Sequence, residues 1–250
     1  MPRQLSFMNL DRGSLGQTTF VKSRDGFRAQ VKKVMPPGKF KTDPAFQKVR
    51  EHNSEFQTAT QAGNLLRSSI DMLIPTGNDA RMVSRLLKVL MRVIKADTVS
   101  LPGKRNVIDG NLSLLRGFEF NDVGTSKYCK AQLAATINRV TGELDINISS
   151  FVPTSVVKPP YGVTHFEIVT AGTELNLEGA TYKTVTKSTG VLPLNATPQV
   201  VAAVHAVTPN STNPLMLVFG VNFYEQLNGV VRPFHEGKEN VVRIVDIQKP

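Results

Sequence analysis

The chain has 250 residues, with 30 Lys+Arg against 20 Asp+Glu and a formal charge of +10, and this length suits one large domain or two small ones. Hydrophobic residues make up 40%, which is enough for a core and excludes wholesale disorder. The single cysteine, Cys129, excludes an internal disulfide and a cysteine-based zinc site, and no apolar run is long enough for a transmembrane helix.

A β-hairpin is predicted over residues 13–33. Two short runs of alternating side chains, 18–22 and 27–31, lie on either side of Asp25-Gly26, a dipeptide that strongly favours a hairpin turn. A hairpin alone is marginally stable, so this one needs a surface to pack on. Pro36-Pro37-Gly38 ends the second strand and opens a basic linker.

A first helix is predicted to begin near Thr42-Asp43-Pro44, because Thr42 or Asp43 can cap it and Pro44 suits its first turn. It must stop before Pro75. Gly63, inside this helix, indicates either a kink or a close helix crossing.

A second helix, over about residues 80–96 with Asn78 or Asp79 as its cap, has the clearest pattern in the chain. On one half of its helical wheel lie Met82, Val83, Leu86, Leu87, Val89, Leu90, Met91, Val93 and Ile94. The opposite half carries five cations, namely Arg81, Arg85, Lys88, Arg92 and Lys95. We call these five the cation stripe; at 1.5 Å per residue it is some 20 Å long.

Residues 101–111 are predicted to be loop, and the pattern after Phe118 is typical of strands. Strands are expected at 132–137, 144–148, 163–171, 173–178, 181–187, 199–207, 215–226 and 240–247, with Asn228-Gly229 as a second hairpin turn. This run favours an antiparallel, immunoglobulin-like β-sandwich. The expected fold class is α+β, with a hairpin and helices in residues 1–116 and the sandwich in 117–250.

The positive charge is concentrated in the first two-fifths of the chain. Residues 1–105 contain 19 Lys+Arg and 8 Asp+Glu, whereas residues 106–250 contain 11 and 12. This asymmetry suggests a basic surface that faces an acidic partner, which could be nucleic acid, an anionic envelope or another subunit. The alternative is a basic surface that only keeps the protein soluble.

Residues for catalysis or metal binding form no recognisable motif. The four histidines, His52, His165, His205 and His235, are dispersed without metal-binding spacing. Cys129 lies between Lys127 and Lys130, which could lower the pKa of its thiol, although a half-buried strand residue is the alternative interpretation. No metal or cofactor is therefore expected.

A set of motifs extends over nearly the whole chain. The set consists of Gly16-x-x-x-Phe20-x-Lys22, Asp25-Gly26-x-x-Ala29, Asp43-Pro44-Ala45-Phe46-Gln47-x-x-Arg50-Glu51-x-x-x-Glu55-Phe56, Ala62-Gly63-x-x-Leu66-Arg67, Arg81-Met82-Val83-Ser84-Arg85-Leu86, Arg105-Asn106-Val107-Ile108-Asp109-Gly110, Ser150-Phe151-Val152-Pro153 and Gly162-Val163-Thr164-His165-Phe166. In these motifs the chain resembles a family of uncharacterised proteins from Bacteroidota, although Val21 stands where an aromatic residue is often found there. The resemblance implies one recurring architecture of hairpin, helices and β-sandwich, and no particular activity.

The predicted function is that of a non-enzymatic structural protein, which assembles with copies of itself into a filament, tube or phage-like particle. The residues expected to make the assembly contacts are Phe20, Lys22, Arg24, Phe27, Arg28, Arg50 and Glu55. The first alternative is a protein that binds nucleic acid or an anionic surface through the cation stripe. The second is an enzyme that uses Cys129 or a pair of histidines.

The compartment is left open by the sequence. The N-terminal segment has no apolar stretch of the secretory type, so cytoplasmic synthesis is the default expectation. Later release to an extracellular or particle assembly remains compatible with it. No membrane span and no small-molecule substrate are expected.

Overall fold

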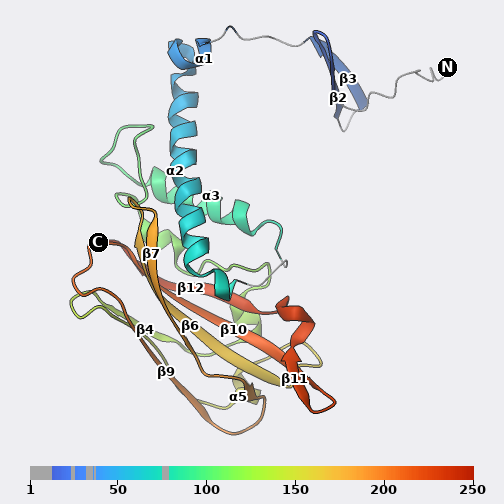
Figure 1. Ribbon diagram of the computed structural model, residues 1–250, viewed down its shortest axis with the longest axis vertical. Helices are drawn as coiled ribbons and strands as arrows, with labels where there is room; N and C mark the ends of the chain where they lie inside the picture. Colours follow the sequence, from blue (N-terminus) through green and yellow to red (C-terminus); the bar gives the residue numbers. More distant parts are fainter. Residues whose placement is uncertain (1–12, 24–25, 32–35, 37, 75–78) are drawn as a thin grey trace, which may run out of the picture. The chain divides into compact units, whose positions relative to one another are not determined.

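The computed structural model describes residues 13–23, 26–31, 36, 38–74 and 79–250 (Figure 1). Within it the chain forms two compact units, Met1–Arg50 and Glu51–Pro250. The predicted division between residues 116 and 117 falls inside the second unit. The reason is that helices before this point and strands after it share one hydrophobic core.

The first unit contains a three-stranded antiparallel sheet. Its strands are β1 (Gly13–Leu15), β2 (Thr18–Ser23) and β3 (Gly26–Val31), in the order β1-β2-β3. The pairing of Ser23 with Gly26 confirms the predicted hairpin, and β1 is an additional strand. Helix α1 (Lys39–Thr42) and a 3-10 helix, η1 (Pro44–Phe46), follow. None of the residues of this unit whose side chains the structure describes is buried.

Helix α2 (Gln47–Ser69) follows η1 directly and ends before a 3-10 helix, η2 (Asp71–Leu73). Asp43 caps η1, the turn that leads into α2, as predicted: its Oδ1 accepts a hydrogen bond from Ala45 N at 2.9 Å. At Gly63 the helix is continuous, and a β-carbon there would lie 3.1 Å from Leu90 Cδ1 of the next helix. Gly63 therefore marks a close helix crossing and not a kink.

Helix α3 (Met82–Lys95) confirms the second predicted helix. Leu86, Leu90, Val93 and Ile94 are buried, as the apolar half of the wheel predicted. Val83 is an exception, because it lies at the margin of that half and its side chain is 48% exposed.

The larger sheet of the second unit has six strands. They are β6 (His165–Asn176), β7 (Thr181–Ser188), β8 (Leu192–Pro193), β10 (Leu215–Leu227), β11 (Val230–Pro233) and β12 (Val241–Gln248). Their order is β11-β10-β6-β7, with β12 beside β10 and β8 beside β6. The two strands expected at 163–171 and 173–178 are one strand, since Gly172 between them is an extended, paired residue. Asn228 and Gly229 form the predicted turn, with φ of 50° and 81°.

The smaller sheet has three strands, β4 (Ala134–Asn138), β5 (Glu143–Phe151) and β9 (Gln199–Ala206), in the order β4-β5-β9. Short helical turns complete the second unit. They are η3 (Leu112–Leu115), α4 (Thr125–Tyr128), α5 (Pro153–Val156) and η4 (Phe234–Gly237). The predicted loop over 101–111 is confirmed.

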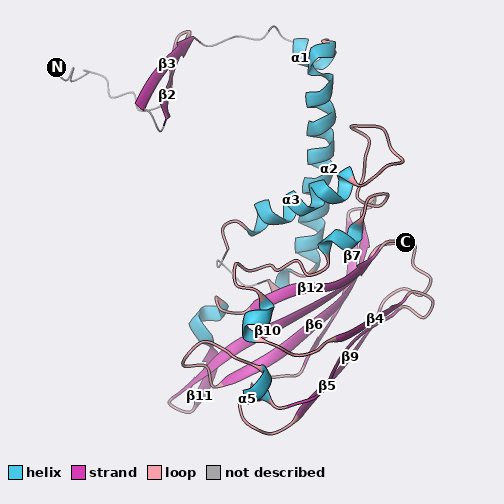
Figure 2. Cartoon of the chain, turned by 180° about the vertical axis from the view of Figure 1, so that it is seen from behind, coloured by secondary structure: helices cyan, strands magenta, loops and turns pink. Residues whose placement is uncertain are grey.

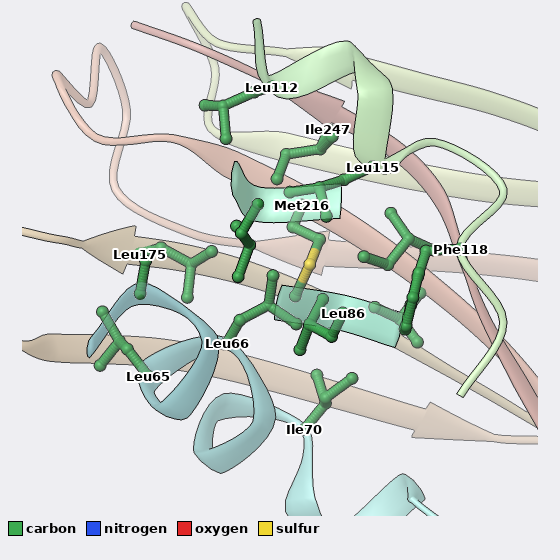
Figure 3. Close-up of a cluster of buried hydrophobic side chains, with 14 of the residues drawn as sticks. Leu65, Leu66, Ile70, Leu86, Leu112, Leu115, Phe118, Leu175, Met216 and Ile247 are labelled. Carbon is green, nitrogen blue, oxygen red and sulfur yellow. The ribbon is translucent and has the colours of Figure 1, made fainter. Parts of the chain in front are cut away.

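Two hydrophobic cores lie on the opposite faces of the larger sheet. On one face, leucines of α2, α3 and η3 pack against Leu175, Met216 and Ile247 (Figure 3). On the other, Leu144, Ile146 and further residues of the smaller sheet pack against it. Figure 2 shows these helices and strands from behind. The α+β class with antiparallel sheets is confirmed, and the immunoglobulin-like strand arrangement stays a prediction.

Candidate interaction surfaces

The hairpin residues expected to make assembly contacts lie on β2 and β3, apart from Arg24, which lies outside the described residues. Phe20 is half-buried, and it pairs with Ala29 across the two strands. Arg28 is exposed and pairs with Val21. Lys22 pairs with Phe27, and the structure places the backbone of both. The described hairpin residues among the expected assembly contacts are therefore brought together on one small sheet.

Arg50 is engaged in the junction between α1 and α2. Its Nη1 donates to the carbonyl oxygens of Phe40 at 2.8 Å and Asp43 at 2.9 Å. The rings of Phe40 and Phe46 pack beside this junction, with centroids 5.6 Å apart. Arg50 thus fixes the direction in which the chain enters α2.

Glu55 is buried within the second unit, where it holds a loop and does not present a surface. Its side chain is 5% exposed, and its Oε1 accepts a hydrogen bond from Gly103 N at 3.0 Å. Arg105 Nη1 lies 3.8 Å from the same oxygen. Gly103 has φ of 83°, and a β-carbon there would lie 2.9 Å from Glu51 Cα. Of the seven expected assembly residues, Glu55 is the one whose contacts belong most fully to the fold.

Arg85 differs from the other members of the cation stripe because it is bonded inside the fold. It forms an ion pair with Asp79, to which Nε donates at 3.1 Å. Its two terminal nitrogens also donate to Glu119 O at 3.0 Å and Asn121 O at 2.9 Å, and the guanidinium lies over the Phe118 ring. Arg85 therefore ties α3 to the segment that leads into the β region.

The remaining four cations of the stripe, Arg81, Lys88, Arg92 and Lys95, are exposed. Lys88 and Arg92 share a shallow recess of about 430 Å³ with Arg116, which follows η3. Arg116 forms an ion pair with Asp246, and its side chain is 51% exposed. The sequence pattern of α3 did not include Arg116, because only folding brings residue 116 beside that helix.

Of the candidate nucleophiles and bases, Cys129 and His205 are buried, whereas His52 and His235 are exposed and His165 is half-buried. Cys129 is 5% exposed and lies in a β-bridge with Val157, and burial raises the pKa of its thiol. His205 is fully buried, and burial lowers the pKa of its imidazole. Within the described part of the chain, no group of three or more His, Cys, Asp or Glu could hold a metal ion.

A buried carboxylate, Glu174, was not recognised from the sequence. It accepts hydrogen bonds from Ser211 Oγ at 2.5 Å, Asn213 Nδ2 at 2.9 Å and Thr208 N at 3.3 Å. Burial alone would raise the pKa of Glu174, but these hydrogen bonds outweigh it and lower the pKa to about 2. All three donors come from the loop between β9 and β10, so Glu174 holds that loop.

A wide, mixed cleft of about 920 Å³ lies between α2, the 101–111 loop and the turn after β6. Gln61, Asn64, Asp109 and Tyr182 are among its exposed polar residues, and Leu65 and Val107 form part of its apolar floor.

Comparison of the chain with protein-family models, curated proteins and solved structures gives no match, which agrees with the resemblance to a family of no established activity. Among the helices of the described residues, none combines the length and the apolar character needed to cross a membrane.

Proposed function

We propose that this protein is a non-enzymatic structural protein that assembles with copies of itself through its N-terminal sheet. The observation that carries the proposal is the sheet β1-β2-β3, in which no side chain that the structure describes is buried within its own unit. Leu15, Val21 and Val31 are 56%, 39% and 72% exposed. A sheet with no packed face is marginally stable in water, so it needs a partner surface.

The energetics favour association. Complete burial of one Val or Leu side chain contributes roughly 1.5–3 kcal/mol. Leu15 and Val31 lie on one face of the sheet and Val21 on the other, so a partner that covers the first face can offset part of the entropy lost in association. In the proposed assembly, the N-terminal sheet of one copy binds a different surface on the next copy. A head-to-tail contact between different surfaces generates rings or open filaments. The excess of positive charge in residues 1–105 over the near-neutral remainder supports the same arrangement.

Sedimentation velocity of the full chain tests this function. Val21→Asp/Val31→Asp places charge on the exposed positions of the N-terminal sheet and should convert large species into monomers. The matched control is Val99→Asp/Val140→Asp, since Val99 and Val140 of the second unit are 83% and 69% exposed. The proposal fails if both variants sediment like the wild type.

A second candidate function is the binding of a polyanion such as nucleic acid. The observation in its favour is the recess that gathers Lys88, Arg92 and Arg116 from two elements. Cations placed in this way can contact several phosphates and release their counterions. Helix α3 has no aromatic residue for base stacking, so the expected binding is independent of sequence.

Binding of a single-stranded oligonucleotide at several salt concentrations tests this second function. Lys88→Gln/Arg92→Gln/Arg116→Gln should weaken binding and reduce the slope of log affinity against log salt by about 2, because each contact with a single strand contributes about 0.7. The control, Lys127→Gln/Lys130→Gln/Lys183→Gln, removes three exposed cations elsewhere. Equal slopes in the two variants would exclude the recess as the binding site.

A further inference from the structure

The outer face of the smaller sheet is lined mostly by short side chains. The register sets three cross-strand rows, which are Asn138–Glu143–Ala206, Thr136–Asp145–Val204 and Ala134–Asn147–Ala202. All of these residues are exposed except Asp145, which is half-buried. The opposite face, with Leu144 and Ile146, is buried against the larger sheet. The outer face is therefore an exposed surface on which another chain can lie.

This face is acidic. The sequences of β4, β5 and β9 contain no Lys or Arg, whereas Glu143 and Asp145 place two carboxylates side by side on β5. Asp145 Oδ1 is buried and has no hydrogen-bond partner. A buried carboxylate oxygen is costly to leave without a donor, so this face fits a partner that supplies cations or N–H groups.

One margin of the face is the free edge of β9, which pairs in the described structure only with β5. Val200 and Val204 of this strand are 67% and 51% exposed on the outer side. A long, apolar edge strand is normally covered or blunted with charges, because its unpaired N–H and C=O groups attract other strands. Over its eight residues, from Gln199 to Ala206, β9 has no such charge.

A recess of about 290 Å³ runs along the inner side of the same edge. It lies between residues 199–203 of β9 and the end of β7 with the turn that follows, and its further lining residues are Ile168, Thr170, Lys187, Ser188, Thr189 and Leu192. In an added strand, alternate side chains point to opposite faces of the sheet. The recess therefore offers space to an inward-facing side chain of an added strand. The residues before and after it on that strand would then lie beside Val200 and Val204 on the outer face.

We propose that the free edge of β9 accepts strand β3 of a second copy by strand addition. This inference rests on the proposed function and names its acceptor site. β3 is the outermost strand of the N-terminal sheet, and its six residues suit the eight of β9. It belongs to the basic part of the chain, whose positive charge complements the carboxylates of the outer face. Ala29 and Val31 alternate with Arg28 and Gln30, the pattern that strand addition requires.

Lysine substitutions at the exposed valines test the acceptor site. Val200→Lys/Val204→Lys should abolish the large species in sedimentation velocity, because two cations then meet a basic strand. The control, Val99→Lys/Leu101→Lys, makes the same change at residues that are 83% and 71% exposed and distant in sequence from β9. The control should sediment like the wild type. Thermal unfolding of both variants checks that the fold is intact.

Cross-linking between copies tests the pairing directly. The experiment uses two single-cysteine chains, Ala29→Cys and Ala202→Cys, each in a Cys129→Ala background. The two chains carry tags of different mass, so that a mixed dimer can be distinguished, and they are mixed and treated with a short bismaleimide. The expected product is a mixed dimer. Ala134→Cys, on β4 at the opposite edge of the sheet, replaces Ala202→Cys in the control and should give much less of it.

The outcomes separate the two proposals. If Val200→Lys/Val204→Lys assembles like the wild type and no mixed dimer forms, the β9 acceptor is wrong. The proposed function then still stands if Val21→Asp/Val31→Asp is monomeric. A cross-link that forms only in a chain carrying both cysteines also overturns the second-copy assignment. A monomeric wild type overturns both.

Discussion

Gly172 of β6 lies directly against His205 of β9: a β-carbon at residue 172 would come within 2.5 Å of the His205 Cβ. His205 Nδ1 lies 2.8 Å from Leu144 O, and its Nε2 lies 3.0 Å from Thr170 Oγ1. Because a carbonyl can only accept, Nδ1 carries the proton and Nε2 accepts from the hydroxyl. The missing side chain of Gly172 thus lets β9 approach the larger sheet.

The first prediction concerns this contact. Gly172→Ala should lower the free energy of unfolding by roughly 1–3 kcal/mol, because a methyl group has no space there and the sheets must separate. Gly124→Ala is the control, since a β-carbon at residue 124 would meet its nearest atom at 3.7 Å. Urea unfolding gives both values. Equal stabilities of the two variants would contradict the described contact.

The second prediction separates two cations of the stripe. Arg85→Gln should lower the free energy of unfolding by roughly 1–3 kcal/mol, because buried acceptors lose their donor. Lys88→Gln, at an exposed position three residues further along α3, should change it by less than about 0.5 kcal/mol. Urea unfolding of the two variants makes the comparison. A larger loss of stability at Lys88 would show that the assignment of Arg85 to the fold and of Lys88 to the exposed surface is wrong.

The third prediction is a pH dependence. The pKa of Glu174 is lowered to about 2 in the folded chain from an ordinary 4.5. A lowered folded pKa means that the stabilisation is complete above about pH 4.5 and is lost as the pH falls toward 2. Glu174→Gln should therefore be less stable than the wild type at neutral pH, and the difference should shrink between pH 4.5 and 2. A difference that stays constant over this range would show that the ionised carboxylate is not responsible.

The fourth prediction concerns the thiol. Burial raises the pKa of Cys129, so its thiolate is both scarce and inaccessible at neutral pH. A thiol-reactive chromophore should label the folded chain very slowly and the chain in denaturant at once. Rapid labelling without denaturant would revive the hypothesis of a reactive cysteine.

Local patterns predicted those parts of the fold that depend on local physics. The hairpin pairing of residues 18–23 with 26–31, the periodicity of α3 and the Asn228-Gly229 turn are predicted from neighbouring residues, and all are confirmed. The division at residues 116 and 117 assumed that helices and strands have separate cores. Only the three-dimensional packing shows that Leu86 of α3 and Met216 of β10 share one.

For the candidate sites, too, the sequence predicted which residues share a face but not which distant residues contact them. The cation pattern placed Arg85 and Lys88 on one face, but not the carboxylate of Asp79 and the carbonyls that bind Arg85. Likewise, Glu55 looked like a surface charge, because its partner Gly103 lies 48 residues away in the sequence. Pairings over such separations are set by tertiary structure and leave no periodic signal.

Self-assembly is tested most directly by negative-stain electron microscopy of the purified, nuclease-treated full chain at low and moderate salt. We expect regular filaments, tubes or rings, which Val21→Asp/Val31→Asp disperses and Val99→Asp/Val140→Asp does not. Small, dispersed particles of the wild type at every salt concentration would contradict self-assembly.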